Sequence, residues 1–220
     1  MTQVISVVQE KGGAGKTTLL SVLASLMVAD GAKVVVIDTD PQRHLEAWAK
    51  KEQTQLDWLY EENDEKLIPT VRALKKADPN YDAIFIDTAG FKSAMAMHAI
   101  AAANLVLIPS KANEADAKGA MRTWSHVRSV AETMEKTIPA HVVMMDVDAN
   151  TNITQAIVDA LDAQNVPRLQ AMCAHRTGFK EMTSTGRAPE GGAKRSAQAV
   201  LAEMQSKGML DYYEGSKWRK

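Results

Sequence analysis

Short apolar runs alternate along this chain with longer stretches in which apolar residues recur at helical spacing. The runs have the length of buried strands and cover residues 4–8, 33–38, 83–87, 105–108 and 141–145. The helical pattern covers residues 17–29, 45–51, 115–134, 153–163 and 194–209. We also expect a short strand around 169–173, a strand end at Pro109 and a loop over 183–193.

This alternation predicts an α/β fold: a single-domain, doubly wound, mostly parallel sheet with helices on both faces. We expect the domain to cover residues 1–210 and residues 211–220 to form a flexible C-terminal tail. In such sheets ligands bind beyond the carboxyl ends of the strands. Candidate functional residues are therefore those that directly follow the predicted strands.

Residues 10–18, which follow the first predicted strand, predict a phosphate-binding loop at the start of a helix. Glycines let the backbone N–H groups turn inward, and the helix N-terminus adds its positive end. Lys16 would reach the β- and γ-phosphates, and the Thr17 hydroxyl would be a ligand of Mg²⁺. Because Glu10 stands where the pattern G-x-x-x-x-G-K-[ST] has its first glycine, a glycine-rich turn with incidental lysines is the alternative. The predicted nucleotide-binding residues are Lys11, Gly12, Gly13, Ala14, Gly15, Lys16, Thr17 and Thr18.

Carboxylates end the second and third predicted strands. Asp38 and Asp40 end the second, and Asp87 ends the third. A nucleotide-bound Mg²⁺ needs nearby carboxylates, and hydrolysis needs a group that positions water. A single acid at a strand end can equally be a helix cap. Acids at two strand ends beside a phosphate loop favour a nucleotide site with Mg²⁺.

Three motifs together resemble the ParA family of partition ATPases, within the deviant Walker P-loop NTPases. They are K-G-G-A-G-K-T-T, D-T-D-P-Q and F-I-D-T-A-G. The resemblance implies that Lys11 crosses to the nucleotide of a partner subunit, that Lys16 binds phosphate and that Asp40 activates water. It also implies that Thr17, Asp38 and Asp87 surround Mg²⁺, and that ATP is held between two subunits. The motif P-Q-x-x-L-x-x-W is similar to short members that lack an N-terminal DNA-reading domain.

Charge is distributed unevenly along a chain that is almost neutral overall. It has 26 Lys+Arg and 27 Asp+Glu, but residues 171–220 hold nine basic and five acidic residues. Members of the ParA family bind DNA without sequence preference, so this end is the candidate DNA surface. The alternative is a solvated helical face. The candidate residues are Arg176, Lys180, Arg187, Lys194, Arg195 and Lys207.

Composition excludes several other classes of protein. With 45% apolar and 24% charged residues, the chain is typical of globular proteins. The single cysteine, Cys173, excludes an intrachain disulfide. The apolar runs are too short to span a bilayer, and we see no signal peptide. We therefore expect a cytoplasmic, nucleoid-associated protein with no membrane partner.

The leading hypothesis is an ATPase that uses ATP and Mg²⁺, forms an ATP-dependent homodimer and coats nonspecific double-stranded DNA. A ParB-like adaptor would stimulate its weak hydrolysis and so drive the segregation of plasmid or chromosomal DNA. A second hypothesis keeps this ATPase but has it position a protein assembly or DNA-transfer machinery. A third is a metabolic P-loop kinase or ligase, against which Lys11 argues, since a self-contained site needs no lysine that crosses to a partner.

Overall fold

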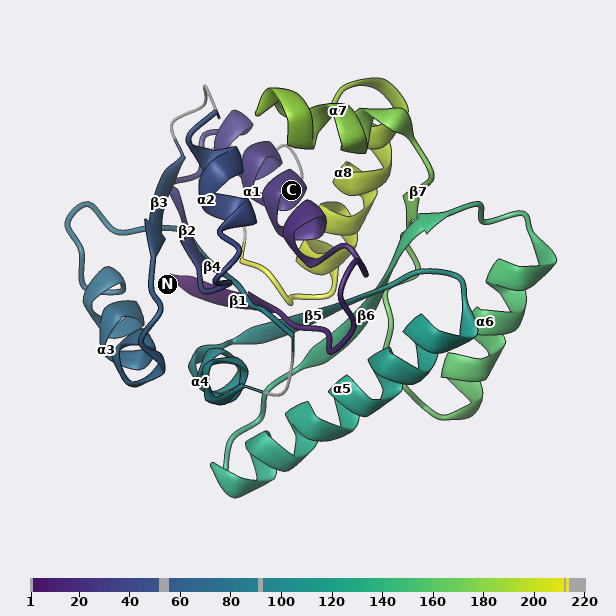
Figure 1. The fold of residues 1–220 in the computed structure, drawn as a ribbon, viewed down its shortest axis with the longest axis horizontal. Helices are drawn as coiled ribbons and strands as arrows, with labels where there is room; N and C mark the ends of the chain where they lie inside the picture. Colours follow the sequence, from purple (N-terminus) through teal and green to yellow (C-terminus); the bar gives the residue numbers. More distant parts are fainter. Residues whose placement is uncertain (1, 52–55, 91–92, 212, 214–220) are drawn as a thin grey trace.

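The computed structural model describes residues 2–51, 56–90, 93–211 and 213. Its strands are β1 (Gln3–Val7), β2 (Val34–Asp38), β3 (Asp57–Tyr60), β4 (Ala83–Asp87), β5 (Leu105–Ser110), β6 (Ala140–Val147) and β7 (Cys173–Ala174). They form one parallel sheet in the order β3-β2-β4-β1-β5-β6-β7 (Figure 1). The predicted doubly wound α/β fold is confirmed.

Helices cover both faces of the sheet (Figure 1). One face carries α1 (Lys16–Ala29), α2 (His44–Ala49), α7 (Thr177–Thr185) and α8 (Gly191–Ser206). The other carries α3 (Asp64–Leu74), α4 (Ala94–Ala102), α5 (Glu114–Thr133) and α6 (Asn152–Ala163). Because the sheet is covered twice, the central strands β2 and β4 are buried along their whole length and need no polar alternation.

Strand β1 lies at the point where the winding of the sheet reverses. It pairs with β4 on one side and with β5 on the other. The chain leaves β1 toward β2, returns to β4 and then crosses to β5. The loop after β1 therefore opens into the crevice at a switch point, where α/β sheets bind ligands.

Several elements depart from the sequence prediction. The sequence pattern did not predict strand β3 or helices α3, α4 and α7. Strand β3 is a four-residue strand at the sheet edge, α3 contains Pro69, and α4 is apolar on almost every side. Strand β5 continues through Pro109 to Ser110, although we expected Pro109 to end it. The pairing of β1 with β5 stops at Leu107, so the N–H group that Pro109 lacks is not needed for a hydrogen bond to β1.

The predicted loop over 183–193 is shorter in the structure. Helix α7 extends to Thr185 and α8 begins at Gly191, which leaves residues 186–190 as the connection. Gly186 ends α7 with a φ of 76°, and a Cβ there would lie 2.5 Å from the backbone of Lys51. Gly186, which the sequence places in a loop, thus ends helix α7 and packs closely against Lys51.

Two residues of the predicted tail, Asp211 and Tyr213, contact the rest of the chain. Asp211 accepts a hydrogen bond of 2.9 Å from Gln3, and the side chain of Tyr213 is buried in the core beneath α1 and α8. Packing of an aromatic ring thus carries the folded part of the chain beyond residue 210. The remainder of the predicted tail, residues 212 and 214–220, lies outside the described residues.

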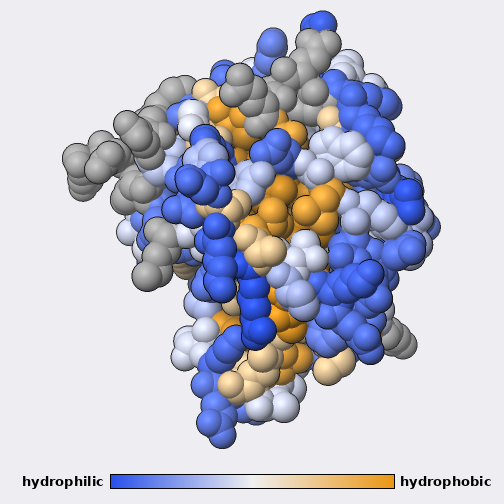
Figure 2. Space-filling model, turned by 90° about the vertical axis from the view of Figure 1, so that its left-hand side faces the viewer, coloured by the Kyte–Doolittle hydropathy of each residue, from blue (hydrophilic) through white to orange (hydrophobic). Residues whose placement is uncertain are grey.

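Cations cover the exposed edge strand β3. Figure 2 shows this end of the molecule, where apolar atoms reach the surface between hydrophilic side chains. The guanidinium of Arg43 lies 3.8 Å from the ring centre of Tyr60, and the ammonium of Lys50 lies 5.3 Å from a ring of Trp58. These contacts place positive charge beside the edge strand, and such charge disfavours pairing with a strand of another molecule. Over the described part of the chain, no helix has the length and apolar character needed to cross a membrane.

Candidate functional site

The phosphate loop follows β1 and leads directly into α1. Gly13 and Gly15 have φ angles of 74° and 101°, a backbone conformation that favours glycine. Gly15 is the residue before α1, and its carbonyl accepts the first helical hydrogen bond, from Leu19 N. Ala14 is fully buried and anchors the loop to the core. The predicted loop therefore has the local geometry that a phosphate group requires.

Strand register brings the predicted acids together. Asp38 and Asp87 are direct partners in the pairing of β2 with β4, and Val7 pairs with Asp87 on the other side. Hydroxyl groups fix this edge: Thr39 donates to the carbonyl of Asp87 at 2.7 Å, and Thr88 donates to that of Val7 at 3.0 Å. Acids far apart in the sequence thus face the phosphate loop at one end of the sheet.

Asp87 is almost fully buried beside the loop. Its Oδ2 atom accepts a 2.6 Å hydrogen bond from the Thr17 hydroxyl, and its Oδ1 atom has no hydrogen-bond partner within the described residues. Burial raises the pKa of Asp87 to about 7, and Asp38 and Asp40 add to this rise. Because Thr17 donates its proton to Asp87, its oxygen keeps lone pairs for a cation. These groups fit Mg²⁺, whose charge would offset the burial of the carboxylate.

Asp38 organises the loop that carries Asp40. Its two carboxylate oxygens accept hydrogen bonds from the backbone N–H groups of Asp40 (2.9 Å) and Glu46 (2.8 Å). Burial raises the pKa of Asp38, although these two hydrogen bonds oppose the shift. Asp38 therefore holds the turn between β2 and α2 in place, besides lying at the edge where we expect Mg²⁺.

Lys16 and Asp40 face one cleft, which we call the phosphate-loop cleft. It has a volume of about 640 Å³ and is lined by Gly12, Gly13, Gly15, Lys16, Thr17, Thr18, Ser21, Asp40, Gln42, His44, Ala47, Trp48, Lys51, Ala89, Gly90 and Thr183. Burial lowers the pKa of Lys16, while Asp87 and Asp40 oppose that shift. Asp40 is half-buried, and its Oδ1 accepts from Gln42 N at 2.9 Å. The cleft thus combines a cation, a water-accessible carboxylate and the glycine loop.

Helix α5 holds the first residues of the loop. Lys11 forms an ion pair with Asp116, which is itself buried, and Asp116 accepts a hydrogen bond from Asn113 at 3.1 Å. Arg122, two turns further along α5, forms an ion pair with Glu10. Lys11 is therefore engaged within its own chain, and it must leave Asp116 before it can reach any other group.

The predicted DNA-binding residues do not all lie together. Arg176, Arg187, Lys194 and Arg195 lie on or beside α7 and α8, and we call this group the α7–α8 basic surface. Arg176 precedes α7 and Lys180 lies within it, so these two residues, although four positions apart, do not share a helix face. Lys207 ends α8, about 20 Å along the helix from Lys194, and forms a 2.6 Å ion pair with Glu203.

Sequence reasoning missed several residues of the site. Asp116 had no assigned role, although it binds Lys11, and the same holds for Glu10, Arg122, Lys111 and Thr183. Asn113 at the start of α5 is the one local signal near Asp116, because an N-cap asparagine places the third helical residue beside itself. The other contacts join distant segments and leave no pattern along the chain.

Comparison with known proteins places the chain among described relatives. The model of the VirC1 protein family matches residues 2–189. Protein virC1 of Rhizobium rhizogenes is 29% identical over 184 residues, which cover 80% of this chain and 78% of that protein. Protein ParA of Rhizobium radiobacter is 30% identical over 143 residues, or 64% of this chain, and this match spans only 63% of that protein.

Solved structures share the fold. An ATP complex of a McdA variant from Cyanothece superposes with a TM-score of 0.78 at 16% identity, over 97% of this chain and 99% of that one. MinD from Pyrococcus horikoshii in complex with Mg-ADP gives a TM-score of 0.71 at 20% identity, over 94% and 98%. At these identities the likeness shows a common fold, and it confirms the α/β architecture that the sequence predicts.

Proposed function

This chain belongs to the VirC1 family, among the ParA- and MinD-type P-loop ATPases, and we propose that it is an ATP-dependent switch that binds DNA. In this proposal ATP and Mg²⁺ occupy the phosphate-loop cleft, two copies of the chain dimerise around ATP, and the dimer binds DNA nonspecifically. Hydrolysis then releases the dimer. The observation that carries the proposal is the convergence of Lys16, Thr17 and Asp87 on one glycine loop.

The cleft supports nucleotide binding through groups that match a polyphosphate. The N–H groups at the start of α1 and the ammonium of Lys16 supply positive charge. Mg²⁺, when bound, would neutralise part of the phosphate charge and polarise the bond to be broken. Thr17 would hold the ion, and Asp38 and Asp87 would lie around it.

Asp40 is the residue that we propose to act on water. It follows the turn held by Asp38, lines the same cleft as Lys16 and remains partly exposed. A carboxylate there can accept a hydrogen bond from a water molecule and orient it toward the terminal phosphate. The hydrogen bond from Gln42 N orients the Asp40 carboxylate.

Lys11 supports a role for dimerisation. In the single chain it is paired with Asp116, directly before Gly12 of the cleft lining, and 43% of its side chain is exposed. A triphosphate on a partner subunit would offer Lys11 stronger, charge-assisted contacts than the single carboxylate does. We propose that ATP draws Lys11 from Asp116 to the partner's nucleotide, so that the dimer persists only while the triphosphate is intact.

The test measures molecular mass by size-exclusion chromatography with light scattering, using an Asp40→Ala variant that binds ATP but hydrolyses it slowly. We expect the mass of this variant to double with ATP and to stay that of a monomer with ADP. We expect its ATP turnover to be about 100-fold or more below that of wild type. Adding Lys11→Ala should abolish the ATP dimer, whereas Lys118→Ala, on an exposed part of α5, should not. Normal hydrolysis by Asp40→Ala would refute the role of Asp40, and a mass that never changes would refute the dimer.

The cargo has two candidates. Segregation of plasmid or chromosomal DNA with a ParB-like adaptor is supported by the similarity to protein ParA. Recruitment of DNA-transfer machinery is favoured by the VirC1 family match, which covers most of the chain. Stimulation of hydrolysis by a small DNA-binding protein encoded beside this gene would select segregation. A transfer protein that stimulates hydrolysis while this neighbour does not would select the second.

A further inference from the structure

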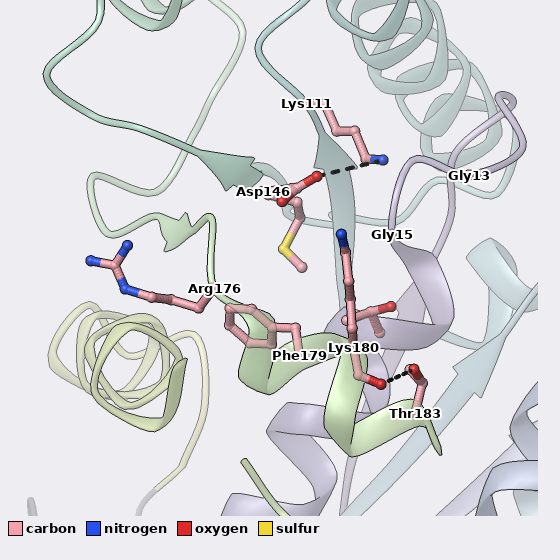
Figure 3. A pocket seen from close by; sticks show the side chains of 10 residues that line it. Gly13, Gly15, Lys111, Asp146, Arg176, Phe179, Lys180 and Thr183 are labelled. Carbon is pink, nitrogen blue, oxygen red and sulfur yellow. Dashed lines mark hydrogen bonds and ion pairs between the residues drawn. The ribbon is translucent and has the colours of Figure 1, made fainter. Parts of the chain in front are cut away.

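A second cavity of about 180 Å³ adjoins the phosphate-loop cleft, and Asp40 lines the cleft but not this cavity. Figure 3 shows the residues that line the cavity. The cavity and the cleft share Gly13, Gly15, Thr18 and Thr183. The opposite wall is formed by the end of β6 and by α7, through Met145, Asp146, Arg176, Phe179 and Lys180, and Lys111 completes the lining. A ligand that reaches this cavity therefore touches the phosphate loop and α7 at once.

The three cations that line the cavity are engaged differently. Lys111 lies 3.8 Å from Asp146, and Arg176 donates a 2.8 Å hydrogen bond to the carbonyl of His175. In Figure 3 the guanidinium of Arg176 points away from the cavity, whereas the side chain of Lys180 extends into it beside Gly15. Within the described residues, the Lys180 ammonium has no ion pair or hydrogen bond. Lys180 is thus a free cation aimed at the phosphate loop.

Asp146 does not cancel this charge, because it is already paired. It has a φ of 57° at an irregularity in the pairing of β6 with β7, which turns its carboxylate out of the sheet. That carboxylate lies 2.5 Å from His175 Nδ1 and 3.8 Å from Lys111. The wall that faces the loop glycines therefore keeps an excess of positive charge, which suits an anion.

Helix α7 is held firmly enough to position this cation. Phe179 and Met182 are buried on its inner face, and the Trp48 indole donates a 3.2 Å hydrogen bond to the carbonyl of Met182. Gly178 lets α7 approach α8 closely, since a Cβ there would lie 3.0 Å from that of Ala193. Lys180 is adjacent to Phe179, so burial of that ring places its neighbour at the cavity.

We propose that Lys180 is a nucleotide-binding residue, which contacts the phosphate nearest the nucleoside, rather than a DNA-binding residue. Thr18 and the loop glycines line this cavity while Asp40 lies outside it, so the cavity suits the part of the phosphate chain remote from the attacked phosphorus. The inference rests on the proposed nucleotide binding. It adds that nucleotide ties α7, and through Gly178 the packed helix α8, to the phosphate loop.

The test is a calorimetric titration of the full chain with Mg-ADP, which requires neither hydrolysis nor a dimer. We expect Lys180→Gln to raise the Kd for ADP about tenfold, since one charge-assisted hydrogen bond is lost. Lys180→Arg should restore affinity to within about threefold of wild type, because the cation is retained. The matched control Lys194→Gln, a basic residue of α8 outside the cavity, should leave the Kd unchanged. Unfolding temperatures without nucleotide should be unchanged, since Lys180 is exposed.

Equal ADP affinity in Lys180→Gln and wild type would overturn the inference while leaving the proposed function intact. The same result with weaker DNA binding would make Lys180 a DNA-binding residue, as the sequence predicts. If wild type binds neither ADP nor ATP, the proposed function fails as well, and Lys16→Gln then behaves like wild type.

Discussion

Two charged regions of this molecule, the phosphate-loop cleft and the α7–α8 basic surface, differ in how far their charged side chains are exposed to water. Beside the cleft, Asp38 and Asp87 are 1% exposed, and burial shifts the pKa values of both and of Lys16, which lines the cleft. On the basic surface Arg176, Arg187 and Arg195 are exposed. Desolvated charges interact strongly with one another and with a ligand, whereas exposed charges are screened by water and salt.

This difference separates two kinds of expected effect. A substitution in the cleft changes a charge that the fold has removed from water, so it alters folding stability and ligand affinity together. A substitution on the basic surface changes a charge that water already stabilises, so under the proposed function we expect it to alter DNA affinity and to leave the fold unaffected. Substitutions in the cleft should therefore change folding stability as well as binding, whereas substitutions on the basic surface should change binding alone.

The largest expected effect is that of Lys16→Gln. Lys16 lies in the cleft with Asp87 and Asp40 as neighbouring charges, and loss of its contacts to phosphate should raise the Kd for Mg-ATP about a thousandfold. Isothermal titration calorimetry measures this change. Lys66→Gln, an exposed residue of α3, is the control and should bind ATP normally. A Lys16→Gln protein that binds ATP like wild type would exclude the cleft as the nucleotide site.

A smaller effect is expected for Asp87→Asn on stability without nucleotide or Mg²⁺. Because burial raises the pKa of Asp87 from 3.8 to about 7, the folded state binds this proton more tightly than the unfolded state does. The resulting stability is complete below pH 4 and is lost as the pH rises through 7, by at most about 4 kcal/mol. Asn cannot ionise, so unfolding temperatures between pH 4 and 8 should decline less steeply than in wild type.

Asp159→Asn, an exposed carboxylate on α6, is the control and should keep the wild-type slope. Asp38 also has a raised pKa, so part of the decline should persist in Asp87→Asn. An identical pH dependence in wild type and Asp87→Asn would show that Asp87 is not a desolvated acid beside the cleft.

The smallest expected effect is that of Arg195→Gln on the basic surface. With ATP present, it should weaken DNA binding a few-fold and lower the slope of log K against log salt by about 1, with no change in unfolding temperature. Fluorescence anisotropy at several salt concentrations measures both quantities. Lys118→Gln, an exposed residue on α5 across the sheet, should change neither. An unchanged salt slope in Arg195→Gln would remove this residue from the DNA surface.

Prediction from the sequence was most successful where local pattern and buried strand coincide. The loop glycines lie directly between β1 and α1, and Lys16 and Thr17 are the first two residues of α1, so their neighbours in sequence are also their neighbours in space. Prediction was weaker where a side chain's direction depends on distant packing. The sequence identifies Lys180 only as one of six candidate DNA-binding residues. In the structure, burial of the adjacent Phe179 turns the Lys180 side chain toward the phosphate loop.

The sequence by itself determined the parallel α/β fold, the phosphate loop and the acids that end β2 and β4. It could do so because apolar periodicity and glycine placement act within a few residues. Only the tertiary structure decided that Asp38 faces Asp87 in register, that Asp116 holds Lys11, and that Arg176 and Lys180 point apart. These outcomes depend on strand order and on the packing of α7 against α2 and α8, which join segments that the linear pattern leaves independent.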